Sequence, residues 1–442
     1  MSNAGGSSGG SGGDAEEYER RMNEAMEAYM NRGMERYMRM VEQQAIPRPP
    51  RVVHHRAVID RDHVAAHQRL YEDYFAEYPR FPANMFRRRF RMRRELFMRI
   101  VRALERQYMC FRFRHDAAGR PGHTPIQKCT AAIGQLAYGG ATDMWDEYLH
   151  IGESSALKCL KDFCGGVISV FGEQYLRSPT PEDCQNLMQM HGEKHGFPGM
   201  LGSIDCMHWE WKNCPTAWKG AYTTGYKSKN PTIILEAVAD YRLWIWHAYF
   251  GVAGSNNDLN VLNSSPLFNE KCQGVGPTVS FVANGNLHDM GYYLADGIYP
   301  RWPVFVKTIR QTSDEKKAYF AQRQESARKD VERAFGVLQS RWAAIKGPTR
   351  LWDVGCVSEI MYACIILHNM IVEDEGVQLT SWVSDDEAGP SHGTATPSVR
   401  QGVPLDEAGR LKEFANMRQV DAHIQLQKDI IEELWARRIA RR

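Results

Sequence analysis

Three acidic side chains have the types and positions needed to hold divalent metal ions. Asp205 lies inside an apolar strand, Asp296 ends another strand, and Glu332 lies on a helix 36 positions after Asp296. Carboxylates that end neighbouring strands, with a third on a following helix, suit a two-metal centre for phosphoryl transfer. The set predicts a site for two Mg²⁺ ions, with Mn²⁺ as a substitute, and DNA as the substrate.

Each acid also has an ordinary structural explanation. A buried carboxylate such as Asp205 is costly unless it is paired, so a salt bridge is an alternative. Asp296 precedes Gly297 and suits an Asx turn. Glu332 borders the apolar stripe of its helix and could be a solvated surface residue. Asp258 is a fourth candidate, and its alternative role is as a helix N-cap.

Cationic side chains accompany these acids in the sequence and would hold phosphates of the DNA backbone. Four are on the helix of Glu332 and three follow the strand of Asp205: Arg328, Lys329, Arg333, Arg341, Lys219, Lys227 and Lys229. Taken singly, each of them also fits a solvated surface.

Other chemistries lack their sequence patterns. Cys206, His208 and Cys214 do not have the spacing of a structural zinc site, and a strand directs Cys206 and His208 away from Asp205. The sequence has no Gly-rich phosphate loop and no nucleophile elbow.

The composition is that of a globular chain. Its 442 residues are enough for two or more domains, and 43% hydrophobic with 24% charged residues is the balance of folded proteins. No run approaches 18 consecutive apolar residues, so no membrane partner is expected. Ten cysteines without a CxxC pair predict reduced thiols. Net charge is only +2, but arginines cluster between Phe86 and Arg114, which is typical of a local polyanion contact and equally of a solvated helix face or a nuclear-import patch.

The N-terminal part of the sequence predicts a tail followed by helices. Residues 1–80 are an expected flexible or partly helical tail, and residues 81–178 an all-α domain of helix-turn-helix type. There a short helix at 144–150, a turn at 151–152 and a helix from Glu153 onward would present side chains to DNA. The DNA contacts expected in this domain are Arg87, Arg88, Arg89, Ser154, Ser155, Lys158 and Lys161. A helical bundle without DNA contact has the same pattern.

The remaining sequence predicts an α/β domain. Polar turn residues at 179–198 indicate a connection, after which strands and helices follow in the order of a ribonuclease H-like fold. Strands are expected at 200–211, 232–239, 243–253, 278–283 and 292–296, and helices at 325–345 and 357–372. This catalytic domain is expected over 195–375, followed by a disordered linker over 376–410 and a C-terminal helix over 411–442.

Four segments resemble the motifs of PIF/Harbinger transposases, most closely those of the Pong-like branch (Ping and Pong elements). In chain order they are GSIDCMHWEWKNCP (202–215), GSNNDLNVL (254–262), LADGIYP (294–300) and VERAFGVLQSRW (331–342), and LHNMIV (367–372) resembles a further block of the family. The resemblance covers roughly residues 80–375 and the C-terminal helix. The first motif departs from the wider family, which has Asp-Gly-Thr-His where this chain has Asp-Cys-Met-His.

The resemblance implies a DDE transposase, which excises an element at its terminal inverted repeats and joins it to target DNA with Mg²⁺ as cofactor. Asp205 and Glu332 are implied as catalytic, and the second aspartate is either Asp258 or Asp296. Asp296 is preferred because it ends a strand and because 35 residues separate it from Glu332, an interval that recurs in retroviral integrases. Asp258 is then an auxiliary acid.

The same resemblance implies a nuclear protein that acts with an element-encoded partner bearing a Myb/SANT-like domain, as a homodimer or larger assembly. Two other functions stay open. One is a domesticated, catalytically silent descendant associated with DNA or chromatin, and the other is a simple nuclease without joining activity.

Overall fold

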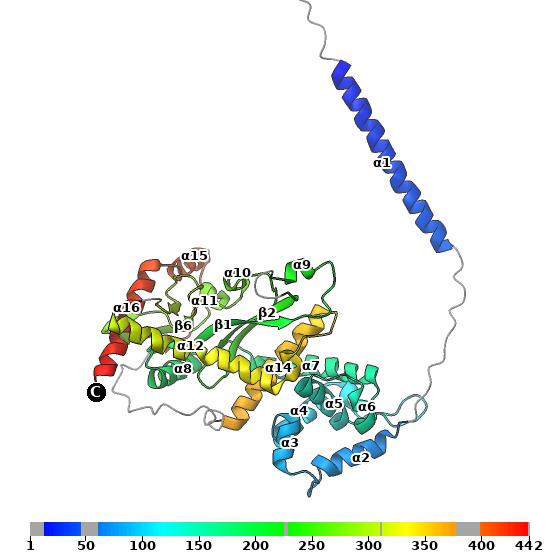
Figure 1. Cartoon of the computed structure of the whole chain (residues 1–442), viewed down its shortest axis with the longest axis horizontal. Coiled ribbons are helices and arrows are strands. Elements are labelled where there is room, and N and C mark those ends of the chain that lie inside the picture. The colour runs from blue at the N-terminus through cyan, green and yellow to red at the C-terminus, as the bar shows by residue number, and fades with distance from the viewer. Residues whose placement is uncertain (1–12, 46–60, 225–228, 310–311, 377–397, 441–442) are drawn as a thin grey trace, which may run out of the picture. The chain divides into compact units, whose positions relative to one another are not determined.

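The computed structural model describes residues 13–45, 61–224, 229–309, 312–376 and 398–440, and the chain divides into two compact units between Asp60 and Arg61. The described part of the first unit is one long helix, α1 (Gly13–Ala45), and the second unit contains the sheets and the other helices (Figure 1). Lys227 and most of the linker expected over 376–410 lie outside the described residues.

Seven helices and a 3₁₀ turn begin the second unit. Their bounds are α2 (His63–Tyr74), α3 (Ala83–Phe90), α4 (Arg94–Gln107), η1 (Met109–Phe111), α5 (Pro125–Tyr138), α6 (Met144–Leu149), α7 (Glu153–Tyr175) and α8 (Pro181–Lys194). Residues from 61 onward belong to this folded unit rather than to a tail ending at 80, because Leu70 is fully buried and Arg61 Nε donates to Asp146 Oδ1 at 2.6 Å. The expected short helix, turn and second helix are present as α6 and α7.

Helix α8 occupies the stretch 179–198, where the sequence pattern indicates only a connection. Thr180 and Asp183 form a capping box, and Pro181 takes the first helical position. The helix buries Leu187 and Met188 on one narrow face, so its overall polar composition hides the helical period.

The main sheet has five strands in the order β3-β2-β1-β6-β7. The strands are β1 (Met200–Glu210), β2 (Thr232–Ala239), β3 (Ile245–Ala253), β6 (Tyr292–Ala295) and β7 (Phe305–Lys307). Strands β1, β2 and β3 form an antiparallel meander, whereas β6 runs parallel to both β1 and β7. The mixture of helices with this mixed sheet agrees with the expected α/β class.

A second sheet of three strands has the order β5-β4-β8 and involves the C-terminal part of the chain. Its strands are β4 (Thr278–Ala283), β5 (Asn286–His288) and β8 (Ser398–Arg400). Strand β8 and the start of α15 fall within 376–410, so this stretch is structured at its described end rather than disordered throughout.

The remaining elements are helices α9 (Lys219–Tyr222), α10 (Asp258–Ser264), α11 (Asn269–Gln273), α12 (Glu315–Arg341), α13 (Ala343–Lys346), α14 (Val354–Glu375), α15 (Glu407–Asn416) and α16 (Val420–Ala440). The helix expected over 325–345 begins ten residues earlier, where Asp314 caps it, and stops at Arg341. The single C-terminal helix expected from 411 is two helices, α15 and α16.

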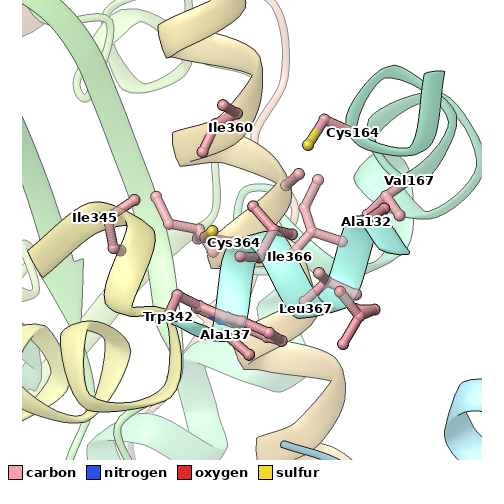
Figure 2. Packing of buried hydrophobic residues seen from close by; sticks show 14 of the residues in the cluster. Ala132, Ala137, Cys164, Val167, Trp342, Ile345, Ile360, Cys364, Ile366 and Leu367 are labelled. Atoms are coloured by element: carbon pink, nitrogen blue, oxygen red, sulfur yellow. The ribbon is translucent and has the colours of Figure 1, made fainter. Parts of the chain in front are cut away.

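The largest hydrophobic core joins the early helices to the sheet through α14. Figure 2 shows Trp342 and Ile345, from the end of α12 and from α13, packed near Cys364 and Leu367 of α14 and near α5. Among the described residues, α14 is also the one helix long and apolar enough to cross a membrane, and 67% of its apolar window is buried within the protein. Its hydrophobicity is therefore explained by its place between α7 and β3.

Candidate catalytic site

Strand β1 carries Asp205 in the middle of the main sheet. Residues 200–204 are buried, because the strand has neighbours on both edges and helices on its faces, and Asp205 is the first residue of the strand that is partly accessible. The side chain of Asp205 is 20% exposed. The position therefore combines a rigid backbone with an opening to solvent.

Helix α12 brings Glu332 to the face of the sheet on which Asp205 lies. The backbone N–H of Val331 donates to Ser203 Oγ at 3.0 Å, and this buried hydrogen bond attaches the helix to β1 two residues before Asp205. One turn before Glu332, Arg328 Nη1 lies 3.1 Å from Asp205 Oδ2 and 2.8 Å from Glu332 Oε1. A single guanidinium thus joins two of the three predicted acids.

The charge of Asp205 is shaped by its surroundings. Burial raises the pKa of its carboxyl to about 6, and the negative charges of Asp258 and Glu332 act in the same direction. The backbone N–H of Cys206, which donates to Asp205 at 2.8 Å, and the Arg328 guanidinium oppose this rise. Asp258 is buried in the first turn of α10, where Asn257 is the N-cap. The structure thus brings Asp258 into the electrostatic environment of Asp205.

The β1–β6 register indicates where Asp296 lies relative to Asp205. Ser203 of β1 lies opposite Leu294 of β6 in the parallel pairing, and Asp205 and Asp296 are each two residues further along. Because side chains alternate between the faces of a sheet, both acids are expected on the same face. Asp296 follows the last residue of β6, and its Oδ1 accepts a hydrogen bond from the Ile298 backbone at 2.7 Å. This is the Asx turn named as its alternative explanation.

A complete metal-ligand cluster is not formed: in the described part of the chain, no three His, Cys, Asp or Glu side chains are arranged to hold a metal ion. Asp205 and Glu332 still fit a cation in one respect, since both contact the guanidinium that stands between them. Carboxylate oxygens are also the ligands that Mg²⁺ prefers. The pair fits part of a Mg²⁺ site, to which Asp258 or Asp296 would add the third carboxylate.

Three of the cations predicted to contact DNA have partners within the protein. Arg341 has an 11% exposed side chain that lies 3.6 Å from Glu375 and 2.9 Å from His368 Nδ1. Arg333 pairs with Asp330 and lies over the Tyr241 ring. Arg89 lies over the rings of Tyr74 and Phe81. Arg341 and Arg89 are held by residues outside their own helices, whereas Asp330 precedes Arg333 by three positions on α12.

Most of the other predicted DNA contacts are exposed, and several of these are already paired. Arg87 forms an ion pair with Glu375 at 2.7 Å and Lys158 with Asp162 at 3.0 Å, whereas Arg328 is bound to the two acids. The remaining described side chains are exposed and do not form an ion pair with another described residue: Arg88, Ser154, Ser155, Lys161, Lys219, Lys229 and Lys329.

The sequence named Arg328 only as a phosphate contact and did not single out Ser203. Arg328 precedes Glu332 by four positions, and that helical spacing signals an ion pair, but its second contact with Asp205 spans 123 positions and has no local signal. Ser203 has no charge or motif of its own, and its role appears only once α12 is seen on β1.

Comparison with known proteins gives two family matches and one relative. Residues 173–378 match the family model described as plant transposon protein, and residues 67–105 match a domain of unknown function, DUF8418. A protein named ALP1-like from Arabidopsis thaliana is 26% identical over 184 residues, which are 41% of this chain and 45% of the relative. No solved structure matches the chain. Over these residues the chain is similar to plant transposon proteins and to this ALP1-like protein.

Proposed function

We propose that the chain is a DDE transposase of the Pong-like branch, with a ribonuclease H-like catalytic domain that cuts DNA at terminal inverted repeats and joins the ends to a target site. The observation that carries the proposal is the contact of Asp205, on the central strand, and Glu332, on α12, with one cation. The strand order β3-β2-β1-β6-β7 and the match to plant transposon proteins support it.

In this mechanism Asp205, Asp296 and Glu332 hold two Mg²⁺ ions, and Asp258 acts as an auxiliary acid. The chemistry that bound Mg²⁺ supplies is activation of water or a 3′-hydroxyl and stabilisation of the leaving oxygen. The protein's own contribution is positioning: Ser203 attaches α12 to β1, and the β1–β6 register supports a position of Asp296 on the same face of the sheet as Asp205. With both carboxylates engaged in holding Mg²⁺, Arg328 would lose at least one of its two present contacts. It can then pair with a phosphate of the DNA backbone.

The proposal includes nuclear location, a Myb/SANT-like partner and a homodimeric or larger active assembly. The exposed residues Ser154, Ser155 and Lys161 at the start of α7 are available for a helix-turn-helix contact with DNA. A modest net charge of +2 suits a division of DNA affinity between two chains.

The test is DNA cleavage by purified protein with Mg²⁺ on candidate element ends, with and without a Myb-like partner. Glu332→Gln should abolish cleavage and joining while leaving DNA binding nearly unchanged. Glu325→Gln is the matched control, because it makes the same change at an exposed position of the same helix. Cleavage by Glu332→Gln at the wild-type rate would reject the site.

A catalytically silent, DNA-associated descendant is the second candidate. It is favoured by Arg328, whose guanidinium occupies the space between the two carboxylates and contacts both. The same assay separates the candidates: wild-type protein that binds the element ends but does not nick or join them in any combination supports the silent form. Nicking without joining identifies a simple nuclease.

A further inference from the structure

A charged surface lies at the end of the main sheet where the parallel strands β6 and β7 finish. It is a groove of about 800 Å³ between the start of α12, the loop after β6 and the C-terminal helix α16. Gly297, which lines it, directly follows Asp296. Lys307, which also lines it, lies opposite Ala295 in the β6–β7 register. The groove is thus continuous with one candidate catalytic residue.

The groove carries a local excess of positive charge. Among the described lining residues, the cations outnumber the acids Asp314 and Glu432: Arg301, Lys307, Lys316, Lys317 and Lys428. Lys316 is held by Glu432 at 2.6 Å, and Lys317 lies 3.9 Å from Asp314. Arg301 and Lys428 are exposed and form no ion pair with a described residue, so their charges are available to a ligand.

Helix α16, which forms one wall of the groove, packs tightly against the rest of the protein, so the groove is preformed. Leu426 and Ile430 of α16 are buried in one cluster with Phe320 of α12 and Val306 of β7. At the groove itself, Gln427 Nε2 donates to the Lys307 carbonyl at 2.8 Å. Helix α16 lies beyond residue 378, where the match to plant transposon proteins ends.

We infer that this groove binds the phosphate backbone of duplex DNA and guides it to the acids at the end of β6. Exposed Arg and Lys side chains lining a concave surface attract a polyanion without reading its sequence. Ligands of open α/β sheets bind beyond the carboxyl ends of parallel strands, which is where this groove lies. The inference rests on the proposed function and deepens it, because it names the surface that delivers the substrate.

The experiment measures the binding of a short labelled DNA duplex to the full chain over a range of salt concentrations, without added metal. The double variant Arg301→Glu/Lys428→Glu is compared with Lys346→Glu/Lys412→Glu, which makes the same change in net charge at exposed positions outside the groove lining. Thermal unfolding confirms that both variants are folded.

The groove variant should bind at least tenfold more weakly than wild type, and the slope of log affinity against log salt should fall by about 2, one for each lost phosphate contact. The control should keep a slope close to that of wild type. Equal affinities and slopes for the two variants would overturn the inference.

DNA-cleavage assays test the proposed transposase function independently of DNA binding by the groove. Weak binding by the groove variant, together with a wild type that never cuts DNA, would keep the groove and reject the transposase. If the wild type cuts DNA and the groove variant binds DNA as well as wild type, the transposase function is supported and the DNA-binding role of the groove is rejected.

Discussion

Arg328 and Asp205 form a partly buried ion pair, 3.1 Å from Nη1 to Oδ2, which ties the middle of α12 to the central strand of the sheet. Glu332 shares the same nitrogen at 2.8 Å. Because both carboxylates contact one cation, substitution of that cation should change the interactions of both.

Replacing Arg328 should destabilise the protein and change its response to Mg²⁺. Arg328→Gln is expected to lower the free energy of unfolding by roughly 1–3 kcal/mol, because two carboxylates lose a charged hydrogen-bond donor. Mg²⁺ should raise the melting temperature of this variant more than that of wild type, since the ion takes over the lost role. Thermal unfolding with and without Mg²⁺ checks both effects, and Lys329→Gln, an exposed neighbour, is the control. Equal Mg²⁺ shifts in all three proteins would contradict the prediction.

The raised pKa of Asp205 predicts how stability depends on pH. In the folded chain this pKa is about 6, above the ordinary aspartate value of about 3.9, so the folded state keeps a proton that the unfolded state has lost. Stability from this group is therefore lost as pH rises from about 4 to about 6.

The substitution Asp205→Asn removes the free-energy cost of ionising a buried carboxyl group. The variant should be more stable than wild type at about pH 8 by roughly 2–3 kcal/mol, and the difference should shrink toward about pH 4. Denaturant unfolding at the two pH values measures it. A variant that is less stable than wild type at both values would show that the ion pair with Arg328 outweighs the cost of burial.

The two candidates for the second aspartate have different expected signatures. Asp296→Asn should abolish DNA cleavage, whereas Asp258→Asn should leave slower cleavage. Because the negative charge of Asp258 raises the pKa of Asp205, its removal should also shift the rise of the pH–rate profile to lower pH. Cleavage rates across a pH series decide the matter, and the opposite pattern would make Asp258 the second catalytic aspartate.

Arg341 is expected to matter for stability rather than for DNA. Arg341→Ala leaves the buried Glu375 carboxylate with Arg87 as its cation, and should cost roughly 3 kcal/mol of unfolding free energy. Burial lowers the pKa of Arg341 to about 10, which reflects how fully it is removed from solvent. Denaturant unfolding tests the loss, with Lys346→Ala as an exposed control. If Arg341→Ala has unchanged stability but binds DNA more weakly, Arg341 contacts a DNA phosphate as the sequence predicts.

Local periodicity predicts much of this fold, because buried strands such as β2 and capped helices such as α5 follow from nearby residues. It also places Asp205 on a strand and Glu332 on a helix. Strand β7 has only three residues, too few for an alternating pattern to be visible. The contacts that define the site are long-range, and Arg328 and Arg341 look alike in sequence although one holds the acids and the other is buried against α14.

The continuity of α12 has a mechanical consequence. Its 27 residues span about 40 Å as one rod, with Lys316 at the groove, Glu332 past the midpoint, and Arg341 fixed to α14 at the far end. A rigid rod cannot tilt at one end without moving along its length. A partner that displaces α14 would therefore also displace α12 and change the distance between Glu332 and the central strand. Binding of a partner and binding of a metal ion would then be coupled through α12.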